Sequence, residues 1–304
     1  MPRATMPDFD LSVTICSWNT VDDLRACLQS LRNAKDEANF EVIVVDNASS
    51  DGSPDMVATE FPEFTLLRQQ TNLGFTGGHN LAIQKRSGRN VALLNSDTVV
   101  HTGAIANLCQ FMDAHPKSGI VGPKLLNPDG TLQLSCRRFP NPIAAAFRNT
   151  FLGRLFPKNK YTREYLMQDW PHDMSREVDW VSGAAMFIRK EVIDQVGLLD
   201  DSLFMFCEDV DLCKRAWQAG FKVTYYPEAV ITHAIGRSTD KVANKMIVRF
   251  HRSMFRYYLK HDVKESLILA RPFLAIFAFL ALSLRASMFL AKNMLDAVRR
   301  KLHV

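Results

Sequence analysis

The first 125 residues alternate short, β-branched apolar runs with segments of helical spacing, and this alternation constrains the fold more than any other feature. The predicted strands are Leu11–Cys16, Phe40–Asp46, Phe64–Arg68 and Asn90–Leu94, and the predicted helices are Val21–Arg32, Pro54–Glu60, Gly78–Arg86 and Gly103–His115. Such alternation predicts an α/β fold, with helices on both faces of a mostly parallel central sheet. Ligands bind beyond the carboxyl ends of parallel strands. We therefore expect a site where polar clusters follow strands, at residues 17–20, 46–53 and 95–97.

Composition excludes several other classes of protein. With 47% hydrophobic and 23% charged residues over 304 positions, the chain can build a sizeable core. Six cysteines without a CxxC pair suggest neither a zinc knuckle nor a disulfide framework, which favours a reducing compartment. The net charge of +5 lacks the concentrated basic stripe of a nucleic-acid-binding protein. The N-terminus has no apolar segment typical of a signal peptide, so secretion is not expected.

Two motifs in this half are suited to a nucleotide. In VVDNASSDGS, Asp46 ends a strand, where an acid can accept hydrogen bonds from a ribose or base; alternatively, Asp46 and Asn47 cap a turn. In TNLGFTGGHN, the glycines precede a predicted helix, and backbone N–H groups at such a place favour phosphate. The chain has no GxGxxG after its first strand and no GxxxxGK[ST], which disfavours a nicotinamide enzyme or a Walker-type ATPase.

A third motif, LLNSDT, places Asp97 just beyond a buried strand. A carboxylate there suits a hard divalent cation that binds mainly through substrate phosphates; the alternative is an Asp-Thr cap of the following helix. His233, followed by Gly236 and Ser238, comes after another predicted strand and could complete a mixed oxygen and nitrogen metal shell. Alternatively, His233 is a structural residue.

Three acids crowd together at Glu208, Asp209 and Asp211. Because residues two apart lie about 200° apart around a helix, Asp209 and Asp211 should point differently, one toward a site and one toward structure. Crowding raises the pKa of one acid, which suits a general base. The alternative is an acidic helix start that complements the macrodipole.

Together these segments resemble family 2 glycosyltransferases of the GT-A fold, especially the bacterial rhamnosyltransferase-like branch. The matching segments cover residues 11–238 in order: SVTICSWN, VVDNASSDGS, NLGFTGGHN, LLNSDT, WVSGAAMFIRKEV, GLLDDSLFMFCEDVDLCKR and HAIGRS. The segment HRSMFRYYLKH, residues 251–261, is also similar to the segment after the core in that branch.

The resemblance implies an inverting sugar transfer from a nucleotide donor. It makes Asp209 the base, Asp97 the last acid of the family's DxD motif holding Mg²⁺ or Mn²⁺, His233 a second metal ligand, and Asp46 the nucleoside-binding acid. Further expected donor-binding residues are Ser17, Asn19, Asn47, Asn72, Gly74, Asn80, Asn95 and Ser96; expected acceptor-binding residues are Trp180, Gly183 and Glu208. Asn95 replaces the first DxD acid, so we expect weak metal binding without donor. The chain has no QxxRW, which argues against a processive synthase.

The expected organisation is a GT-A domain over residues 1–240, with a nucleotide-sugar half (1–125) and an acceptor and catalytic half (126–240). The sequence predicts a hairpin around Pro128–Gly130 and a helix over 241–261. Residues 143–177 lack periodicity and are either a surface excursion or a loop that shapes an acceptor pocket.

The C-terminal region, residues 241–304, is expected to be an amphipathic helical tail. Its apolar run from Pro272 to Leu284 is short for a bilayer span. Basic residues recur at multiples of seven: Lys264, Arg271, Arg285, Lys292 and Arg299. This stripe favours a helix lying on an anionic membrane at the cytoplasmic face; pairing with another subunit and a true span are the alternatives.

The favoured donor is dTDP-L-rhamnose, with a UDP-hexose as the second choice and a UDP-GlcNAc- or UDP-galactose-type transferase as the alternative. The expected acceptor is a glycan or polyprenyl-linked glycan in cell-surface polysaccharide synthesis. A sugar-nucleotide pyrophosphorylase is disfavoured because SWNTVDDL contains neither the Arg nor the Lys expected there. A catalytically silent membrane scaffold is disfavoured because Asp97, Asp209 and His233 are all present.

Overall fold

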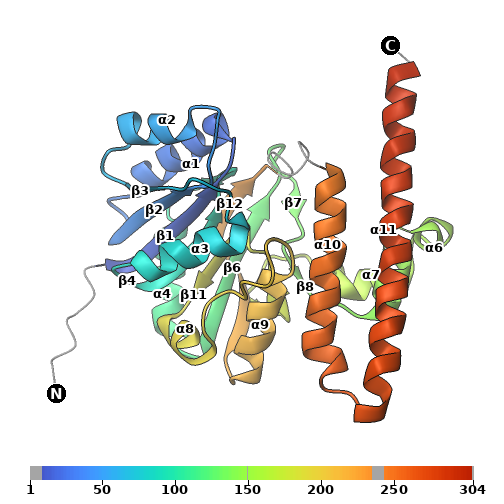
Figure 1. Ribbon diagram of the computed structural model, residues 1–304. Coiled ribbons are helices and arrows are strands. Elements are labelled where there is room, and N and C mark those ends of the chain that lie inside the picture. The colour runs from blue at the N-terminus through green and yellow to red at the C-terminus, as the bar shows by residue number, and fades with distance from the viewer. Residues whose placement is uncertain (1–8, 149, 235–242, 303–304) are drawn as a thin grey trace.

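The computed structural model describes residues 9–148, 150–234 and 243–302, so Gly236 and Ser238 lie outside the described residues. Its centre is a ten-stranded sheet with the order β3-β2-β1-β4-β11-β6-β12-β5, in which β7 also pairs with β6 and β9 with β12 (Figure 1). The strands of this sheet are β1 (Phe9–Ser17), β2 (Phe40–Asp46), β3 (Thr65–Arg68), β4 (Gly88–Asn95), β5 (Thr98–Val100), β6 (Ser118–Leu126), β7 (Leu132–Gln133), β9 (Arg176–Glu177), β11 (Ala185–Ile188) and β12 (Lys222–His233). A separate ribbon joins β8 (Cys136–Arg137) to β10 (Trp180–Val181).

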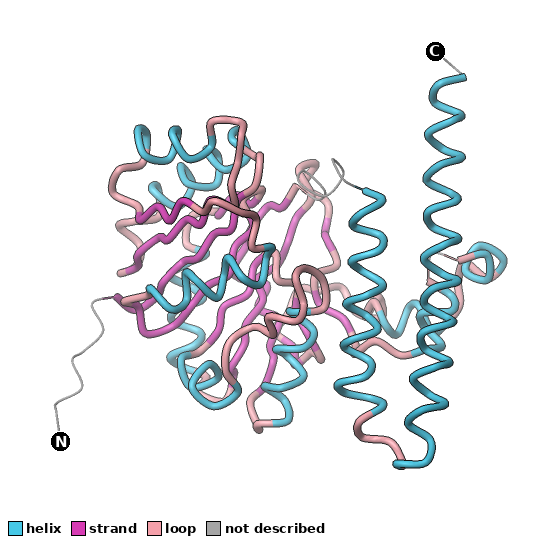
Figure 2. The backbone as a smooth tube through the Cα atoms, in the orientation of Figure 1, coloured by secondary structure: helices cyan, strands magenta, loops and turns pink. Residues whose placement is uncertain are grey.

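The N-terminal strands form the predicted parallel arrangement, because β2 and β4 flank β1 and β3 pairs with β2, all in parallel. The second half of the chain extends the same sheet, with β11 antiparallel between β4 and β6, and β12 parallel to β6. The expected boundary between the two halves, at residue 125, falls within β6. Both halves therefore share one continuous sheet, visible as the magenta strands in Figure 2.

Helices cover both faces, as predicted. The helices that precede β12 are α1 (Val21–Asn33), α2 (Ser53–Glu60), α3 (Gly74–Lys85), α4 (Ala104–Ala114), α5 (Pro142–Phe147), α6 (Phe151–Leu155), α7 (Lys160–Tyr165), α8 (Lys190–Val196) and α9 (Glu208–Gln218). Side chains of α1, α2 and α4 pack with alternate residues of β1 and β2 in one core, whereas α8 and α9 pack on the opposite face. Leu24, Leu28 and Leu31 of α1 show the helical spacing that buries one stripe.

One local expectation was wrong, and one of the alternatives is excluded. Helix α3 begins at Gly74 rather than Gly78, so its glycines lie in its first turn instead of preceding it. Gly74 has a φ of +76°, and a Cβ there would lie 2.5 Å from the carbonyl oxygen of Phe204, so this glycine permits close packing. Asp97 does not cap α4, because Thr98 begins β5 and Gly103 is the residue before α4.

The region after β6 contains the predicted hairpin and then residues 143–177, for which two alternatives were left open. The predicted hairpin is confirmed by the antiparallel pairing of β6 with β7 and by a turn in which the N–H of Asn127 donates to the carbonyl of Thr131. The following segment folds into the short helices α5, α6 and α7. Ala144 and Tyr165 of this segment are buried, and both line the large cavity described below.

The chain ends in a helical hairpin made of α10 (Ala243–Tyr258) and α11 (Arg271–Leu302), which lie side by side next to the sheet domain (Figure 1). A π-helical turn, Leu259–Val263, follows α10. This turn is anchored by Asp211 of α9, whose fully buried carboxylate contacts His261 and Lys260 at 2.7 Å and Arg215 at 2.8 Å. Burial raises the pKa of Asp211, but the hydrogen bond from His261 and the charges of Arg215 and Lys260 outweigh it and hold this pKa at about 2. Asp211 is thus the structural member of the acid cluster, as the sequence predicted for one of the pair.

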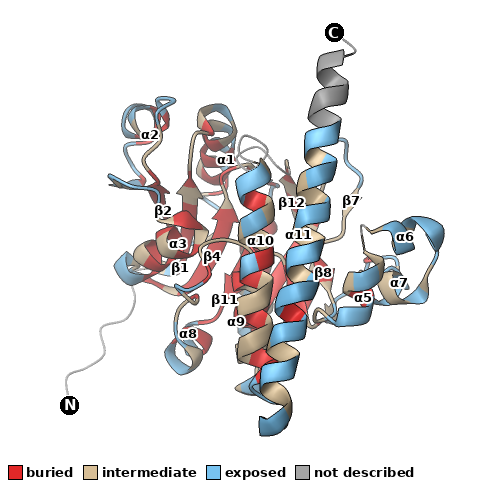
Figure 3. Ribbon diagram, turned by 45° about the vertical axis from the view of Figure 1, so that its right-hand side comes forward, coloured by how far each residue is buried: buried red, intermediate tan, exposed pale blue. Residues whose placement is uncertain are grey.

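Helix α11 exposes most of its apolar side chains (Figure 3). By length and composition alone, the segment Ile268–Leu295 is the one helix among the described residues that could cross a bilayer. It is longer than the run from Pro272 to Leu284 because the helix continues through Arg285. The predicted basic stripe is not a single surface: Lys264 precedes α11, Arg285 points into the protein, and the side chain of Arg299 lies outside the described residues.

Candidate functional site

The carboxyl ends of β1 and β4 are joined by hydroxyl groups. Ser17 lies 3.1 Å from the Thr20 hydroxyl, which lies 2.9 Å from that of Ser96. All three side chains are buried. These contacts fix the loop that carries Asp97 against the end of β1, so the predicted clusters at residues 17–20 and 95–97 do meet in space.

Asp46 lies at the end of β2 and is also buried. One carboxylate oxygen accepts a hydrogen bond from the N–H of Ser49 (3.1 Å), so Asp46 does cap a turn. Its other oxygen, Oδ1, has no hydrogen-bond partner among the described residues. A buried oxygen without a partner is costly, and a hydroxyl or N–H group of a ligand would satisfy it. Asn19 borders this loop, where its side-chain oxygen accepts from the N–H of Ser50 at 2.8 Å.

The remaining predicted donor-binding residues bond within the protein. The Asn47 amide donates to the carbonyl of Gly74 (3.0 Å). The Asn72 oxygen accepts from the Gly74 N–H (2.8 Å). The Asn80 amide donates to the carbonyl of Leu199 and to the carboxylate of Asp201. These three asparagines shape the loop before α3 and the segment around residue 200.

Asp97 and His233 come together at the end of β4, as predicted. The Asp97 Oδ1 atom lies 3.3 Å from His233 Nε2, which lies 3.1 Å from the amide nitrogen of Asn95. Gln133 orients the imidazole, because its Oε1 lies 2.7 Å from His233 Nδ1 and its amide donates to the His233 carbonyl. This arrangement puts the ring proton on Nδ1, so the Nε2 lone pair accepts from the Asn95 amide and lies beside the Asp97 carboxylate.

The Asp97 oxygen and the Nε2 lone pair lie 3.3 Å apart and repel each other, so a cation bound to both would relieve this repulsion. The oxygen and imidazole ligands fit a divalent cation such as Mg²⁺ or Mn²⁺. The described residues contain no group of three His, Cys, Asp or Glu side chains that could hold a metal. A cation here would therefore need ligands from a bound substrate. Sequence reasoning missed Gln133, which no motif marks.

Asp209 is the second residue of α9, and the two residues before this helix, Phe206 (φ 71°) and Cys207 (φ 67°), are in the left-handed region. Such a conformation is unfavourable for residues with a side chain and is often found at functional sites. The Asp209 carboxylate accepts hydrogen bonds from the N–H groups of Gly183 (3.0 Å) and Val210 (2.8 Å). A Cβ at Gly183 would lie 3.3 Å from the Phe75 ring, so a larger residue would crowd this contact.

The electrostatics of Asp209 suit a base. Burial raises the pKa of its carboxyl, although the two backbone N–H groups act in the opposite direction. Burial, reinforced by the charge of Asp209, raises the pKa of Glu208 well above its ordinary value. The Oε2 atom of Glu208 is buried and has no partner among the described residues. Of these two neighbouring carboxyls, Glu208 therefore favours its protonated form, whereas the Asp209 carboxylate is oriented by two N–H donors.

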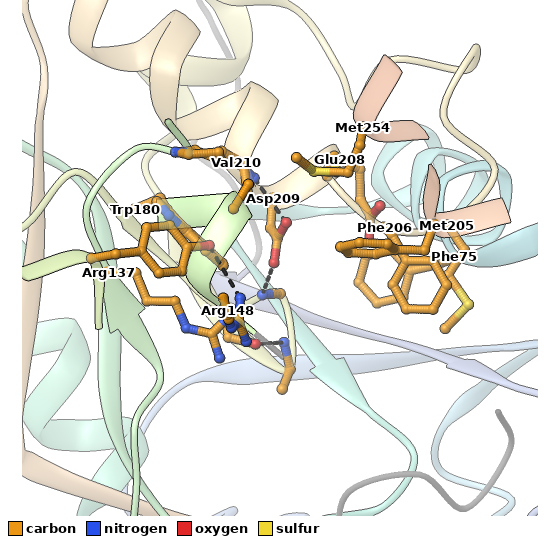
Figure 4. Close-up of a pocket in the computed structure, with 18 of the residues that line it drawn as sticks. Phe75, Arg137, Arg148, Trp180, Met205, Phe206, Glu208, Asp209, Val210 and Met254 are labelled. Carbon is orange, nitrogen blue, oxygen red and sulfur yellow. Dashed lines mark hydrogen bonds between the residues drawn. The ribbon is translucent and has the colours of Figure 1, made fainter. Parts of the chain in front are cut away.

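One cavity, of about 260 Å³, is lined both by residues beside Asp97 and by Asp209 with its neighbours. Asn95 and His233 line it, together with Asp209, Glu208 and Trp180. In Figure 4, Asp209 lies between Trp180 with Arg137 and Arg148 on one side, and Phe75, Met205, Phe206 and Met254 on the other. The structure therefore brings the predicted acceptor residues and two of the residues at the proposed metal position into one space. Asp46 and Asn19 do not line this cavity.

Sequence reasoning missed three arginines that line the cavity, Arg137, Arg148 and Arg285. They come from β8, the segment after α5, and α11, which are far apart in the sequence. Arg285 was assigned to a solvent- or membrane-facing stripe, because heptad spacing does not reveal which face of a helix packs inward.

Comparison with known proteins identifies the family. A profile described as "Glycosyltransferase like family 2" matches residues 7–249, most of the chain. The chain belongs to glycosyltransferase family 2. It is 29% identical to the N-acetylglucosaminyl-diphospho-decaprenol L-rhamnosyltransferase of Mycobacterium tuberculosis, over 81% of this chain and 82% of the relative. The rhamnosyltransferase WbbL of Escherichia coli K12 is 26% identical over 83% of this glycosyltransferase and 93% of WbbL.

Solved structures place this glycosyltransferase in the GT-A fold. The Pyrobaculum calidifontis mannosyltransferase PcManGT, in complex with GDP-Man and Mn²⁺, superposes with a TM-score of 0.55 at 17% identity, covering 98% of this chain and 84% of that one. GalNAc-T7 with UDP, GalNAc and Mn²⁺ gives a TM-score of 0.55 at 15% identity, covering 85% and 51%. These likenesses confirm the predicted fold.

Proposed function

We propose that this glycosyltransferase is an inverting, metal-dependent enzyme that transfers a sugar, with dTDP-L-rhamnose favoured over a UDP-hexose, to a lipid-linked glycan acceptor. The observation that carries the proposal is the cavity that contains the Asn95–His233 edge and the buried carboxylate of Asp209. Inverting transfer needs a leaving-group site and a base on opposite sides of the sugar. The rhamnosyltransferase names of the relatives support the choice of donor.

Each group has a distinct role in the proposed reaction. Asp46 accepts a hydrogen bond from the nucleoside through its unpartnered Oδ1. Asp97 and His233 would hold a divalent cation, Mg²⁺ or Mn²⁺, which would supply positive charge to offset that of the departing diphosphate. Asp209 takes the proton of the acceptor hydroxyl as that oxygen attacks the anomeric carbon. Trp180 provides an apolar wall for the acceptor sugar, fixed by the hydrogen bond from its indole N–H to the Arg138 carbonyl (2.8 Å).

The test of this function is nucleotide release from a panel of sugar nucleotides, with and without Mg²⁺ or Mn²⁺. We expect acceptor-dependent release from dTDP-L-rhamnose and its loss in EDTA. Preferential use of UDP-GlcNAc or UDP-galactose would favour the alternative transferase. Undiminished turnover in EDTA would rule out the metal role of Asp97 and His233.

The neutral Asn95 predicts weak metal binding in the donor-free protein. We expect Asn95→Asp to tighten donor-free Mn²⁺ binding about tenfold, because the charge of the ligands tunes the affinity of such sites. Isothermal titration of the donor-free protein measures this affinity. Asn33→Asp, an exposed substitution at the end of α1, adds the same charge elsewhere and should change nothing. Tight Mn²⁺ binding by the unaltered donor-free protein would contradict the proposal.

We also propose that α11 associates with the cytoplasmic face of an anionic membrane. Phe273, Phe277 and Leu284 are 74%, 67% and 65% exposed, so a bilayer would bury apolar surface that the chain itself leaves uncovered. Replacing both Phe277 and Leu284 with Asp should weaken sedimentation with phosphatidylglycerol vesicles at least about tenfold, since each side chain contributes roughly 1.5–3 kcal/mol. Met174→Asp, on the catalytic domain, is the control. Unchanged sedimentation, with concentration-dependent dimers in solution, would favour pairing of α11 with a second copy.

A further inference from the structure

The cavity beside Asp209 contains three arginines that lack carboxylate partners. Arg137, Arg148 and Arg285 all line it, and among the described residues none forms an ion pair with an acid. Burial lowers the pKa of Arg148, and the positive charges of Arg137 and Arg285 lower it further. Gathering three like charges in a partly buried space is unfavourable, so an anion in this cavity would stabilise the protein.

The hydrogen bonds of these guanidinium groups are few and long. Arg148 reaches the Tyr165 hydroxyl at 3.4 Å, and Arg285 reaches the Arg148 carbonyl and His251 Nε2, each at 3.4 Å. Arg137 reaches the Leu134 carbonyl at 3.4 Å. The Nε atoms of Arg137 and Arg285 are buried without a partner. Each guanidinium carries five N–H donors, so most of the hydrogen-bonding capacity of the cluster is unused within the described residues.

Aromatic rings hold the three groups in place. The guanidinium carbon of Arg137 lies 5.1 Å from the centre of the Trp180 ring, that of Arg148 lies 5.3 Å from Tyr165, and that of Arg285 lies 5.0 Å from Phe289. Stacking occupies a face of the planar group and leaves its N–H edge available. That edge matches the spacing of phosphate oxygens, which a guanidinium can bind in bidentate fashion.

The position of Arg285 indicates which kind of ligand the anionic group belongs to. It lies midway along the exposed apolar helix α11, and its neighbours Leu284 and Met288 are 65% and 50% exposed. The same helix therefore turns a charge into the catalytic cavity and an apolar surface outward. A ligand that joins a phosphate to a hydrocarbon chain would satisfy both surfaces at once. A soluble anion would bind the arginines in the cavity but would leave the apolar surface of α11 uncovered.

We propose that Arg137, Arg148 and Arg285 form the binding site for the phosphate or diphosphate of a lipid-linked acceptor, next to the sugar whose hydroxyl faces Asp209. This site rests on the proposed glycosyl transfer to a lipid-linked acceptor. It assigns α11 a second role: besides meeting the membrane, the helix completes the acceptor site with its own side chain.

Binding of farnesyl diphosphate to the full-length protein in neutral detergent, measured by isothermal titration, tests the site. We expect Arg148→Gln and Arg285→Gln each to weaken binding by about tenfold to hundredfold, the range for a lost hydrogen bond to a charged group. Arg285→Lys should recover part of the affinity, because it keeps the charge without the planar edge. Arg154→Gln, on exposed α6, should bind like the unaltered protein. Farnesol should bind more weakly than farnesyl diphosphate and equally to all variants.

Several outcomes would overturn the site. Equal binding of farnesyl diphosphate to all variants would exclude the arginines. A parallel loss of dTDP binding would assign them to the donor. Loss of binding to phosphatidylglycerol vesicles, with farnesyl diphosphate binding intact, would assign them to membrane headgroups. Because this readout requires no turnover, an inactive enzyme that still binds farnesyl diphosphate through Arg285 would contradict the proposed transfer and not the site.

Discussion

Asp209→Asn is expected to lower kcat about 10³-fold, within the usual range for losing a general base. The asparagine oxygen can still accept the N–H of Gly183, and the remainder of the cavity is unchanged. It cannot, however, take the proton of an acceptor hydroxyl. Steady-state release of nucleotide in the presence of acceptor measures kcat. Donor binding should remain within about twofold of the unaltered protein, because the Asp209 carboxylate bonds to Gly183 and Val210, which are not among the proposed donor-binding residues.

The pH dependence gives an independent check. Because burial raises the pKa of Asp209, the unaltered enzyme should lose kcat as pH falls through a value above the ordinary carboxyl range, as the base becomes protonated. Asp209→Asn should abolish this acid limb. Asp194→Asn, which alters an exposed carboxylate on α8, is the matched control. A wild-type rate for Asp209→Asn with a true acceptor would disprove its role as base.

Asp211→Asn should lower the free energy of unfolding by about 3–5 kcal/mol, as expected when one partner of a buried ionic network is removed. The substitution leaves Arg215 without the carboxylate that it contacts at 2.8 Å, and leaves Lys260 with Asp200 as its only carboxylate partner among the described residues. Since the turn that carries Lys260 and His261 connects α10 to α11, the loss should loosen the helical hairpin as well. Chemical denaturation of the full chain measures the change in stability.

The pH profile of stability has a defined sign. The folded-state pKa of Asp211, about 2, lies below the unfolded value of about 3.9. Its contribution is therefore complete above pH 4 and is lost as pH falls toward 2. Asp55→Asn, which breaks the exposed contact with Arg68, should cost less than about 1 kcal/mol. Equal costs for Asp55→Asn and Asp211→Asn would contradict the anchoring role of Asp211.

Most of the sheet domain could be predicted from local patterns. The runs Leu11–Cys16 and Phe40–Asp46 predicted strands within a few residues of β1 and β2, because β-branched side chains on both faces of a buried strand leave a continuous apolar signal. Asp46, at the end of the second run, was predicted for a related reason: a carboxylate that ends a buried strand is an exception to the local pattern. Asp97 beside His233 follows this logic.

Sequence alone determined the fold class, the family resemblance, the meeting of Asp97 with His233, and the different directions of Asp209 and Asp211. The fold class and the directions of the two acids follow from periodicity, whereas the family resemblance, carried by contiguous motifs, implied that Asp97 and His233 meet although they lie far apart in the sequence. Tertiary structure alone decided that Gln133 orients His233, that Asn80 binds the segment near Asp201, and that Arg285 enters the cavity beside Asp209. The reason is that these contacts join residues 100 or more positions apart, or depend on the rotation of a helix about its own axis, and neither leaves a local trace.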